Sequence, residues 1–528
     1  MQRTETKRPP SAFDALGLKQ TAAGLVEEIQ SLYLADSVPW VVGYSGGKDS
    51  TACLQLVWMA LAALPAEQRT KPVHVISTDT LVENPVVAAW VTRSLKTMEE
   101  AAAKEGLPIK PHRLTPEVSD TFWVNLIGKG YPAPRPKFRW CTERLKIRPS
   151  NAFISKVVRQ NGEVILVLGT RKAESAARAR SMEKHERRRV RERLSPNASL
   201  PNSLVYSPIE DWTNDDVWMF LMQYPNPWGY RNKDLLTMYQ GASADGECPL
   251  VVDSSTPSCG DSRFGCWVCT LVEQDKSMQA MIQNDEEKEW MLPLLELRNE
   301  LDQTNDRNLR DFRRMTGSLL IHNGQLVHGP YKQEIRERWL RRVLEAQQLV
   351  RRNGPENVRN IELITHEELE EIRRLWVIEK HEVEDNLPRI YEDVTREKYP
   401  GRPLDDGFSF NAEEMALLRE VCGEDELRFQ LARELLDIER RHRTMVKRSG
   451  LFEALQKTIK KSFYSGAEDA EQYAKDRQEF REQMLARLEP TAPPEAPKRS
   501  SRETPKSNDR QLPLLPEESS GDAPDQAV

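Results

Sequence analysis

The chain has 528 residues, of which 38% are hydrophobic and 30% charged, and its mean hydropathy is −0.65. This length suits about three or four domains of ordinary size. No apolar run approaches the ~20 residues that a membrane-spanning helix needs, and the first residues lack the apolar core of a secretory signal. We therefore expect a cytoplasmic protein with no membrane partner.

The formal net charge is −6, from 76 Lys and Arg against 82 Asp and Glu. This balance argues against a protein that coats nucleic acid by charge alone, but it permits a local basic patch. The seven cysteines are an odd number in a chain without an export signal, which disfavours a disulfide framework. Four of them lie within Cys248–Cys269, so metal ligands or reactive thiols are expected there.

The N-terminal half has the composition of an α/β domain. Residues 1–30 are expected to form a helical segment that precedes it. Residues 31–272 alternate short β-rich runs with helical stretches, which predicts a mostly parallel sheet with helices on both faces. The strand candidates are the short apolar runs Trp40–Tyr44, Val73–Thr78 and Val164–Leu168.

The C-terminal half has the composition of a helical region followed by a tail. Residues 273–485 are rich in Glu, Arg and Leu and are predicted to be mainly α-helical, with Leu427, Leu431, Leu435 and Ile438 spaced as one apolar helix face. A hairpin with the turn Asn323-Gly324 is expected within residues 318–330. Residues 486–528 are predicted to be a disordered tail, because the 39 residues from Pro490 onward contain eight prolines and few apolar residues.

The strongest motif is Ser45-Gly46-Gly47-Lys48-Asp49-Ser50, between the first strand candidate and a helical run. Such a loop aims several backbone N–H groups at one point beside a helix N-terminus, where an anion is stabilised. The two glycines permit close backbone approach, and Ser45, Lys48 and Ser50 can add hydrogen-bond donors. We interpret the segment as a nucleotide phosphate site, with Lys48 and Asp49 as catalytic candidates.

Two further segments follow strand candidates at the same predicted sheet edge. Asp79 comes after residues 73–78, where a carboxylate can accept from a ribose or adenine group or help hold Mg²⁺; a helix N-cap is the structural alternative. Gly169, Arg171, Glu174 and Arg178 follow the candidate at 164–168. The two arginines are suited to phosphate, and Glu174 is placed to orient one of them.

These motifs resemble those of the PP-loop ATP pyrophosphatases, in the branch similar to phosphoadenosine phosphosulfate (PAPS) reductases. The segment at 45–50 matches the pattern SGGxDS, and the segment at 169–178 resembles GxRxxES..R. Residues 208–218 resemble PIxxWTxxDVW, in which Thr213 is a candidate N-cap and Val217 and Trp218 a core face. The resemblance implies the adenine nucleotide alpha hydrolase-like fold and ATP cleavage between the α and β phosphates with Mg²⁺.

The candidate metal ligands are Cys248, Cys259, Cys266 and Cys269. Two residues separate the last pair, a spacing that lets both sulfurs face one metal centre. Such a set holds either zinc or an iron–sulfur cluster. Zinc sites commonly pair two CxxC units, and this set has one, which favours a 4Fe-4S cluster.

Cys141 stands apart from this set, among Arg139, Arg144, Lys146 and Arg148. These cations are expected to lower the pKa of the thiol and to favour the thiolate. Cys141 also aligns with the region where cluster-type sulfonucleotide reductases carry a Cys-Cys pair, although Trp140 replaces the other cysteine here. It is either a further cluster ligand or a sulfur-carrying nucleophile, and we favour the second. Cys53 and Cys422 are interpreted as ordinary residues.

The combination of motifs resembles the DndC-like family of bacterial DNA phosphorothioation (Dnd) systems. The motifs that carry this resemblance are the PP-loop, the segment at 169–178, WCTERLKIRP at 140–149 and RFGCWVCT at 263–270. The resemblance covers roughly residues 15–465. It implies an ATP pyrophosphatase and sulfurtransferase with a 4Fe-4S cluster. Its implied partners are DNA, a cysteine desulfurase as sulfur donor, and other Dnd subunits, with which it replaces a non-bridging phosphate oxygen by sulfur.

The best local candidate for a DNA contact is the segment Arg171–Arg193, which holds ten basic residues against four glutamates. Phosphate contacts of this kind give sequence-independent affinity that falls steeply with salt. A solvated basic loop is the structural alternative.

Three other functions fit part of the pattern. A PAPS or APS reductase shares the loop and arginine motifs but uses a C-terminal catalytic cysteine, and no cysteine follows Cys422. A PP-loop tRNA thiolase would also use ATP and often a cluster, but such enzymes are usually shorter. A non-catalytic scaffold that senses nucleotide or redox state is disfavoured by the intact Ser45, Asp49 and Asp79.

Overall fold

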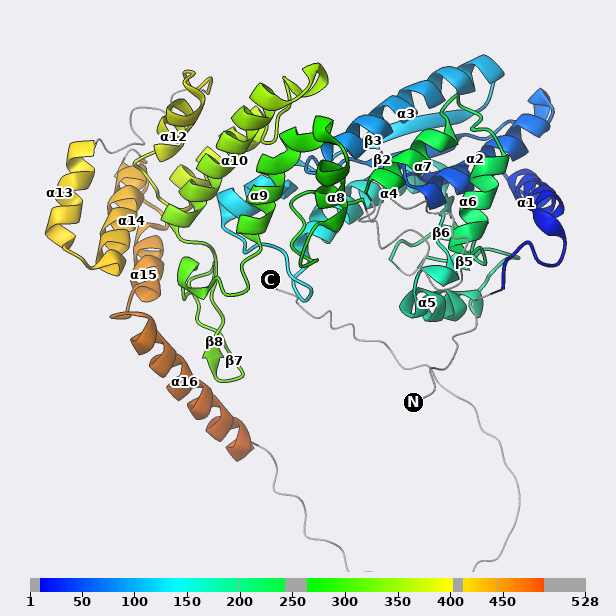
Figure 1. Cartoon of the computed structure of the whole chain (residues 1–528). Helices are drawn as coiled ribbons and strands as arrows, with labels where there is room; N and C mark the ends of the chain where they lie inside the picture. Colours follow the sequence, from blue (N-terminus) through cyan, green and yellow to red (C-terminus); the bar gives the residue numbers. More distant parts are fainter. Residues whose placement is uncertain (1–9, 198, 243–263, 402–411, 444, 489–528) are drawn as a thin grey trace, which may run out of the picture. The chain divides into compact units, whose positions relative to one another are not determined.

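The computed structural model describes residues 10–197, 199–242, 264–401, 412–443 and 445–488 (Figure 1). Its contacts divide the chain into two units, residues 1–474 and 475–528. The strands are β1 (Trp40–Gly43), β2 (Val73–Thr78), β3 (Ile109–Leu114), β4 (Val164–Val167), β5 (Ser195–Pro196), β6 (Ser203–Tyr206), β7 (Ile321–His322) and β8 (Gln325–Leu326). The helices of the α/β part are α1 (Gly17–Leu34), α2 (Lys48–Ala63), α3 (Pro85–Glu105), α4 (Arg148–Asn161), α5 (Ala176–Glu186), α6 (Asn214–Gln223) and α7 (Asn232–Gly241).

The later helices are α8 (Lys276–Asn284), α9 (Leu292–Leu301), α10 (Gln333–Asn353), α11 (His366–Arg374), α12 (Asn386–Thr395), α13 (Ala412–Cys422), α14 (Glu426–Arg443), α15 (Leu451–Lys461) and α16 (Ala467–Leu488). In Figure 1 they are coloured green to orange and, among the described residues, only the short β7–β8 hairpin interrupts them. The predicted helical C-terminal region is therefore confirmed. None of the described helices combines the length and apolar character needed to cross a membrane.

One sheet carries the α/β part, with the strand order β3-β2-β1-β4-β6-β5. Its pairings are parallel except for the one between β5 and β6, so the predicted mostly parallel sheet is confirmed. The register sets Trp40 beside Val73 and Ile165. All three strand candidates form strands, and two of them end one residue earlier than expected.

Strand β3 is an element that the sequence did not predict. Its residues Ile109–Leu114 include Pro111 and alternate weakly in polarity. A proline cannot donate to a strand ladder and is tolerated only where one side of the strand is unpaired. Strand β3 satisfies this condition because it lies at the end of the sheet, with β2 as its neighbour in the strand order.

The two faces of the sheet are covered by different helices. Trp40 and Val42 belong to a large core formed with side chains of α1, α2, α3, α6 and α7. Val41 points to the other face, where it packs with Ile154 and Val157 of α4. This alternation follows from the period of two along a strand. Because both faces of β1 are buried, its sequence is a continuous apolar run.

A second apolar core joins residues from both sides of residue 272. It includes Trp140 and Trp267, which neighbour the cysteines, together with Trp339 and other side chains of the helical region. Buried hydrogen bonds cross the same boundary, because the Nε1 of Trp123 donates to the carbonyl of Leu363 at 2.6 Å. The segments that carry Cys141 and Cys266 are therefore held by the helical region.

Helix α14 shows a departure from the predicted apolar face. Its buried residues are Phe429, Arg433, Asp437 and Ile438, so Ile438 of the predicted face is buried, while Leu427, Leu431 and Leu435 are only half-buried. Charged pairs explain this rotation: Arg433 contacts Glu384 at 2.7 Å, and Asp437 accepts from His381. A buried charge is stable only when it is paired, so the helix orientation depends on partners that helical periodicity does not show.

The expected hairpin at residues 318–330 is confirmed. Strands β7 and β8 pair antiparallel, with Ile321 opposite Leu326. Asn323 and Gly324 both have positive φ, at 50° and 72°. This is the type I′ geometry that an Asn-Gly pair favours, because the turn twist matches the twist of the strands.

A pair of histidines gives a prediction about acid stability. His74 Nδ1 of β2 lies 3.0 Å from His112 Nε2 of β3, with Phe153 of α4 against both rings. Burial lowers the pKa of His74 to about 4, and burial also lowers the pKa of His112. His112 and Lys110 lower the pKa of His74 further. Lys110 and Lys156 do the same for His112, on which Glu99 acts in the opposite direction.

We expect the free energy of unfolding to fall as pH decreases from about 6.5 to 4. The unfolded chain binds a proton at His74 in this range and the folded chain does not, so acid favours unfolding. The loss should be about 1–2 kcal/mol after allowance for solvent screening. Urea unfolding at pH 7 and pH 5 checks this. His74→Gln should lose less stability on acidification, and an equal loss in both proteins would contradict the assignment to His74.

Candidate functional site

The loop between β1 and α2 has the compact form expected of a phosphate-binding loop. Gly46 has φ 75°, and an added Cβ there would lie 2.5 Å from a methyl group of Val91. The Oγ atoms of Ser45 and Ser50 are 3.1 Å apart, and Ser50 Oγ donates to the carbonyl of Gly47 at 3.0 Å. Gly46 is therefore required for both its positive φ and its close packing. The loop leads into the N-terminus of α2, as the sequence predicted.

Asp49 links the first loop to the third predicted segment. Its carboxylate accepts from Lys48 Nζ at 3.1 Å and from Arg171 Nε at 2.7 Å. The side chain of Arg171 is only 4% exposed, and its NH1 donates to the carbonyl of Trp212 at 3.2 Å. Asp49 is thus the counter-charge of a buried arginine, and it fixes Lys48 and Arg171 on either side of one carboxylate.

Gly169 permits this close approach. An added Cβ at Gly169 would lie 2.6 Å from the carbonyl oxygen of Asp49 and 3.0 Å from the amide nitrogen of Ser50. Real Cβ atoms do not approach backbone atoms so closely, so only glycine leaves the start of α2 in its place. The sequence had placed Gly169 in the nucleotide site, and the structure gives it this steric role.

We expect Gly169→Ala to lower ATP affinity at least tenfold, because the new methyl group must displace the first turn of α2, which follows the loop. Overpacking of this kind also costs about 1–3 kcal/mol of stability. Isothermal titration with ATP measures the affinity. Gly24→Ala is the control: Gly24 lies in α1, its added Cβ meets nothing within 4 Å, and ATP affinity should not change. Equal affinity in all three proteins would contradict the role of Gly169.

Glu174 organises the segment that follows β4. Its Oε1 accepts from the backbone N–H of Arg171 at 2.9 Å, and its Oε2 lies 3.3 Å from Arg178 Nε. The expectation that Glu174 orients an arginine agrees with these contacts. Arg178 is half-exposed, whereas Arg171 is buried, so only Arg178 presents a guanidinium to solvent.

Asp79 directly follows β2, as the sequence predicted, and β2 pairs with β1, the strand that precedes the Ser45–Ser50 loop. Its Oδ1 accepts from the backbone N–H of Leu81 at 3.0 Å, and its Oδ2 accepts from Arg113 Nε at 3.1 Å. The N-cap of α3 is Asn84, whose side chain accepts from Val86. The alternative in which Asp79 caps that helix is therefore wrong.

The segment after Asp79 leads directly to the cysteines. Thr80 Oγ1 lies 3.3 Å from Cys266 Sγ, and Glu83 forms an isolated β-bridge with Cys266. The N–H of Trp267 donates to the carbonyl of Val82 at 2.9 Å. The strand end that belongs to the predicted nucleotide site thus also positions the Cys266–Cys269 pair. Cys248 and Cys259 lie outside the described residues.

Cys141 lies near this pair. Burial raises the pKa of Cys141, and the neighbouring Cys269 raises it further. The predicted lowering by flanking cations is wrong, because Arg144 and Arg148 turn away to Asp120, at 2.9 and 2.8 Å. Lys146, by contrast, is a described cation that does interact with the thiols.

Lys146 interacts electrostatically with the three thiols of Cys141, Cys266 and Cys269. Burial acts to lower its pKa, but Cys266, Glu83, Cys141 and Cys269 outweigh this effect and its pKa is raised. Burial raises the pKa of Cys266 to about 11, and Lys146 opposes that rise. The lysine therefore favours negative charge on the sulfurs.

The donor set suits an iron–sulfur cluster in its chemistry. Cysteine thiolates are the ligands of such clusters, and Cys141, Cys266 and Cys269 are partly buried beside an apolar core. Across the described residues, no three Cys, His, Asp or Glu side chains are already close enough to hold a metal ion. Of the four candidate cluster ligands, the structure describes Cys266 and Cys269. The ammonium group of Lys146 interacts with both, and the hydroxyl of Thr80 contacts Cys266.

Sequence reasoning missed two aromatic residues of this site. Tyr239 of α7 places its hydroxyl 3.4 Å from the Lys48 amide nitrogen, and Lys48 Nζ lies 5.6 Å from the centre of its ring. Phe264 packs edge-on against Tyr239 at 4.7 Å, two residues before Cys266. Tyr239 and Phe264 join the loop to the cysteine segment. Tyr239 has no motif around it, and Phe264 lies within RFGCWVCT but has no chemistry of its own to single it out, so only the fold reveals the contact.

The segment Arg171–Arg193 is less free for DNA than its composition suggests. Six of its ten basic side chains form ion pairs within the chain: Arg171, Lys172, Arg178, Arg189, Arg191 and Arg193. Their partners include Asp49, Glu210 and Asp36. The exposed side chains that form no ion pair with a described residue are Arg180, Lys184, Arg187 and Arg188. The segment therefore has a smaller free charge than +6.

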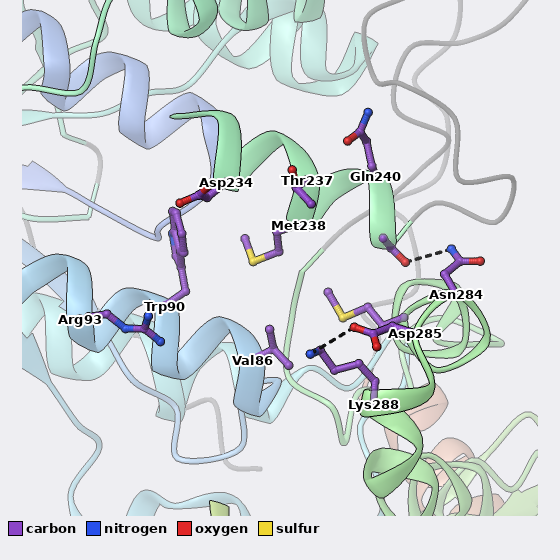
Figure 2. A pocket seen from close by; sticks show the side chains of 12 residues that line it. Val86, Trp90, Arg93, Asp234, Thr237, Met238, Gln240, Asn284, Asp285 and Lys288 are labelled. Carbon is purple, nitrogen blue, oxygen red and sulfur yellow. Dashed lines mark hydrogen bonds and ion pairs between the residues drawn. The ribbon is translucent and has the colours of Figure 1, made fainter. Parts of the chain in front are cut away.

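A cavity of about 550 Å³ is lined by residues of α3, α7 and α8 and of the segment that follows α8 (Figure 2). Trp90 lines it and also adjoins the loop, since its Cδ1 lies 3.4 Å from the Cβ position of Gly46. Figure 2 shows Met238 near Trp90 and the ion pair of Asp285 with Lys288 at the rim. The cavity is mainly apolar and does not include the cysteines or Asp49.

The sequence has a partial match to a known family. The model of the phosphoadenosine phosphosulfate reductase domain matches residues 39–227. An uncharacterized protein of Methanocaldococcus jannaschii is 26% identical over 245 residues, which cover 46% of this chain and 39% of that protein. The chain thus spans about two fifths of the length of this curated relative.

Solved structures resemble the fold more distantly. FMN adenylyltransferase of Candida glabrata, in complex with FAD and inorganic pyrophosphate, has a TM-score of 0.25 at 13% identity and covers 47% of this chain and 73% of its own. The U34-tRNA thiolase NcsA of Methanococcus maripaludis, with its 4Fe-4S cluster, has a TM-score of 0.26 at 14% identity and covers 55% and 80%. The match to the phosphoadenosine phosphosulfate reductase domain covers residues 39–227, which include the Ser45–Ser50 loop, Asp79 and the Arg171 segment.

Proposed function

We propose that this chain is the ATP-dependent sulfurtransferase of a DNA phosphorothioate modification system. One observation carries the proposal. The strand end at Asp79, beside the nucleotide loop, continues into Thr80, whose hydroxyl lies 3.3 Å from Cys266 Sγ. A candidate ATP site and candidate sulfur-handling thiols therefore share one edge of the sheet, where open α/β sheets bind ligands.

ATP would be cleaved between its α and β phosphates. A non-bridging oxygen of a DNA phosphate attacks the α-phosphorus, the bond from that phosphorus to the bridging oxygen breaks, and pyrophosphate leaves. The backbone of the Ser45–Ser50 loop and Lys48 are placed to stabilise the negative charge of the pyrophosphate, with Mg²⁺ as the counter-ion of the phosphates. Asp49 keeps Lys48 and Arg171 in position.

Sulfur would then replace the activated oxygen. A sulfur atom at the oxidation level of hydrosulfide attacks the DNA phosphorus, and the bond to the oxygen shared with AMP breaks, so AMP leaves with that oxygen. A cysteine desulfurase and a thiol reductant supply the sulfur and its electrons. Cys141 is the candidate carrier of that sulfur, and Lys146 stabilises the anionic form of a nearby thiol.

A 4Fe-4S cluster, held by Cys248, Cys259, Cys266 and Cys269, would supply iron that can bind sulfur. Within this chain, Trp140 and Trp267 belong to the apolar core beside the thiols and exclude water from it. The helical region contributes to this core, which gives it a role in shielding the site.

The test is product formation by the full chain with ATP, Mg²⁺, a cysteine desulfurase, a thiol reductant and either duplex DNA or tRNA. We expect pyrophosphate release that DNA stimulates, and nuclease digestion followed by mass spectrometry should show phosphorothioate linkages. Thiolated bases in tRNA, with none in DNA, would instead favour a tRNA thiolase. Sulfite formed from added PAPS or APS would favour a sulfonucleotide reductase.

A further inference from the structure

A second cavity, of about 470 Å³, lies at the C-terminal end of β3 and beside the first turns of α4. Four cations line it, Arg113, Arg144, Arg148 and Lys156, against two carboxylates, Glu117 and Asp120. Its lining therefore carries a net charge of +2. It is separate from the Ser45–Ser50 loop and from the cavity of Figure 2, with which it shares no lining residue.

Asp120 offsets part of the positive charge of this cavity and also orders two of its arginines. The carboxylate accepts from Arg144 NH1 at 2.9 Å and from Arg148 NH1 at 2.8 Å, so both guanidiniums are held in a fixed arrangement. Arg148 is half-exposed and keeps further N–H groups for a ligand. Lys156 is exposed and forms no ion pair with any residue that the structure describes. Ordered guanidiniums beside a free ammonium suit a phosphate ligand.

The cavity adjoins both halves of the proposed reaction site. Arg113 of its lining is the ion-pair partner of Asp79, at the end of β2. The Oγ of Ser150, in α4, lies 3.0 Å from Thr78 Oγ1 at the same strand end. The helical segment 141–156 carries Cys141 and Lys146 toward the thiols and Arg144, Arg148 and Lys156 into the cavity.

We propose that this cavity binds backbone phosphates of DNA next to the phosphate that is modified. The inference rests on the proposed function and names the place where its substrate is held. It differs from the sequence-based expectation, which placed the DNA contact at the segment Arg171–Arg193. A strand that lies in the cavity would place a neighbouring phosphate toward Asp79 and the thiols.

Charge reversal at Lys156 tests the proposal. Fluorescence anisotropy of the full chain with labelled duplex DNA, over a range of salt concentrations, gives the affinity and its salt dependence. We expect Lys156→Glu to weaken DNA binding about tenfold and to reduce the slope of log K against log salt by about one. Arg159→Glu, in the same helix and outside the cavity, is the matched control and should change the affinity less than twofold.

Several results would overturn the proposal. The first is that the unmodified chain does not bind DNA at low salt. The second is that Lys156→Glu and Arg159→Glu lose equal DNA affinity, and the third is that only Arg187→Glu, in the segment Arg171–Arg193, loses it. An equal loss of affinity for ATP or inorganic pyrophosphate would make the cavity part of the nucleotide site, and binding of RNA alone would exclude DNA as its ligand. The binding assay does not require turnover, so it separates this proposal from the proposed function. If the chain never forms phosphorothioate but still binds DNA in a way that depends on Lys156, the proposed function is refuted and the DNA site remains supported.

Discussion

Asp49→Asn should abolish most of the pyrophosphate release, by at least 100-fold. The substitution keeps the size of the side chain and removes the charge that holds Lys48 at 3.1 Å and Arg171 at 2.7 Å. A displaced Lys48 cannot stabilise the leaving pyrophosphate, and the loss of one such contact typically costs two to three orders of magnitude in rate. Pyrophosphate release with DNA and sulfur donor present is the measurement.

The same variant should also be less stable, because Arg171 is 4% exposed and would lack its counter-charge. Breaking a buried pair in this way costs about 3–5 kcal/mol. Asp36→Asn is the matched control, since Asp36 pairs with Lys71, whose side chain is also 4% exposed, in a region remote from the loop. It should lose stability in the same way and keep its pyrophosphate release. Equal catalytic losses in the two variants would show that Asp49 acts only through folding.

Cys266→Ser should prevent assembly of an iron–sulfur cluster, while Cys141→Ser should retain it. Cys266 lies within the CxxC pair and contacts Thr80, whereas Cys141 comes from a different segment and only neighbours Cys269. After anaerobic reconstitution with iron and sulfide, the unmodified chain is expected to bind about four irons. Iron content and visible absorption should fall in Cys266→Ser and Cys269→Ser.

The role of Cys141 then appears in a different measurement. Cys141→Ser should form pyrophosphate but lose phosphorothioate formation at least 100-fold, because the sulfur carrier is missing. Cys53→Ser is the control, as Cys53 is a fully buried core residue of α2. Loss of iron from Cys141→Ser would instead make Cys141 a cluster ligand, and unchanged phosphorothioate formation would exclude it from sulfur transfer.

The local motifs were well predicted because they depend on few neighbouring residues. The Ser45–Ser50 loop, the Thr213 cap of α6 and the Asn323-Gly324 turn each need particular backbone angles or donors within a short segment. Thr213 caps α6 in a capping box with Asp216, and Val217 and Trp218 are buried as expected. Such features follow from the chain itself, whatever packs around them.

Contacts between distant segments were harder to predict. The partner of Arg171 is Asp49, 122 residues earlier, and nothing in either motif indicates that this arginine is buried. The pKa of Cys141 was predicted in the wrong direction because adjacent cations in sequence point elsewhere in space: Arg144 and Arg148 reach Asp120 instead. Charges that are close in sequence need not interact, because helical side chains at neighbouring positions point in different directions.

The sequence by itself determined the mostly parallel α/β domain, the glycine loop Ser45–Ser50 and the grouping of cysteines, because hydrophobic runs, glycines and CxxC spacing are local properties. Only the tertiary structure decided what these parts do together. The end of β2 carries Asp79 to the loop and Thr80 to Cys266, and the helical region supplies the apolar core around Cys141. The net charge of −6 likewise conceals a cavity of net positive charge, because the total charge of a chain says nothing of where folding places its cations.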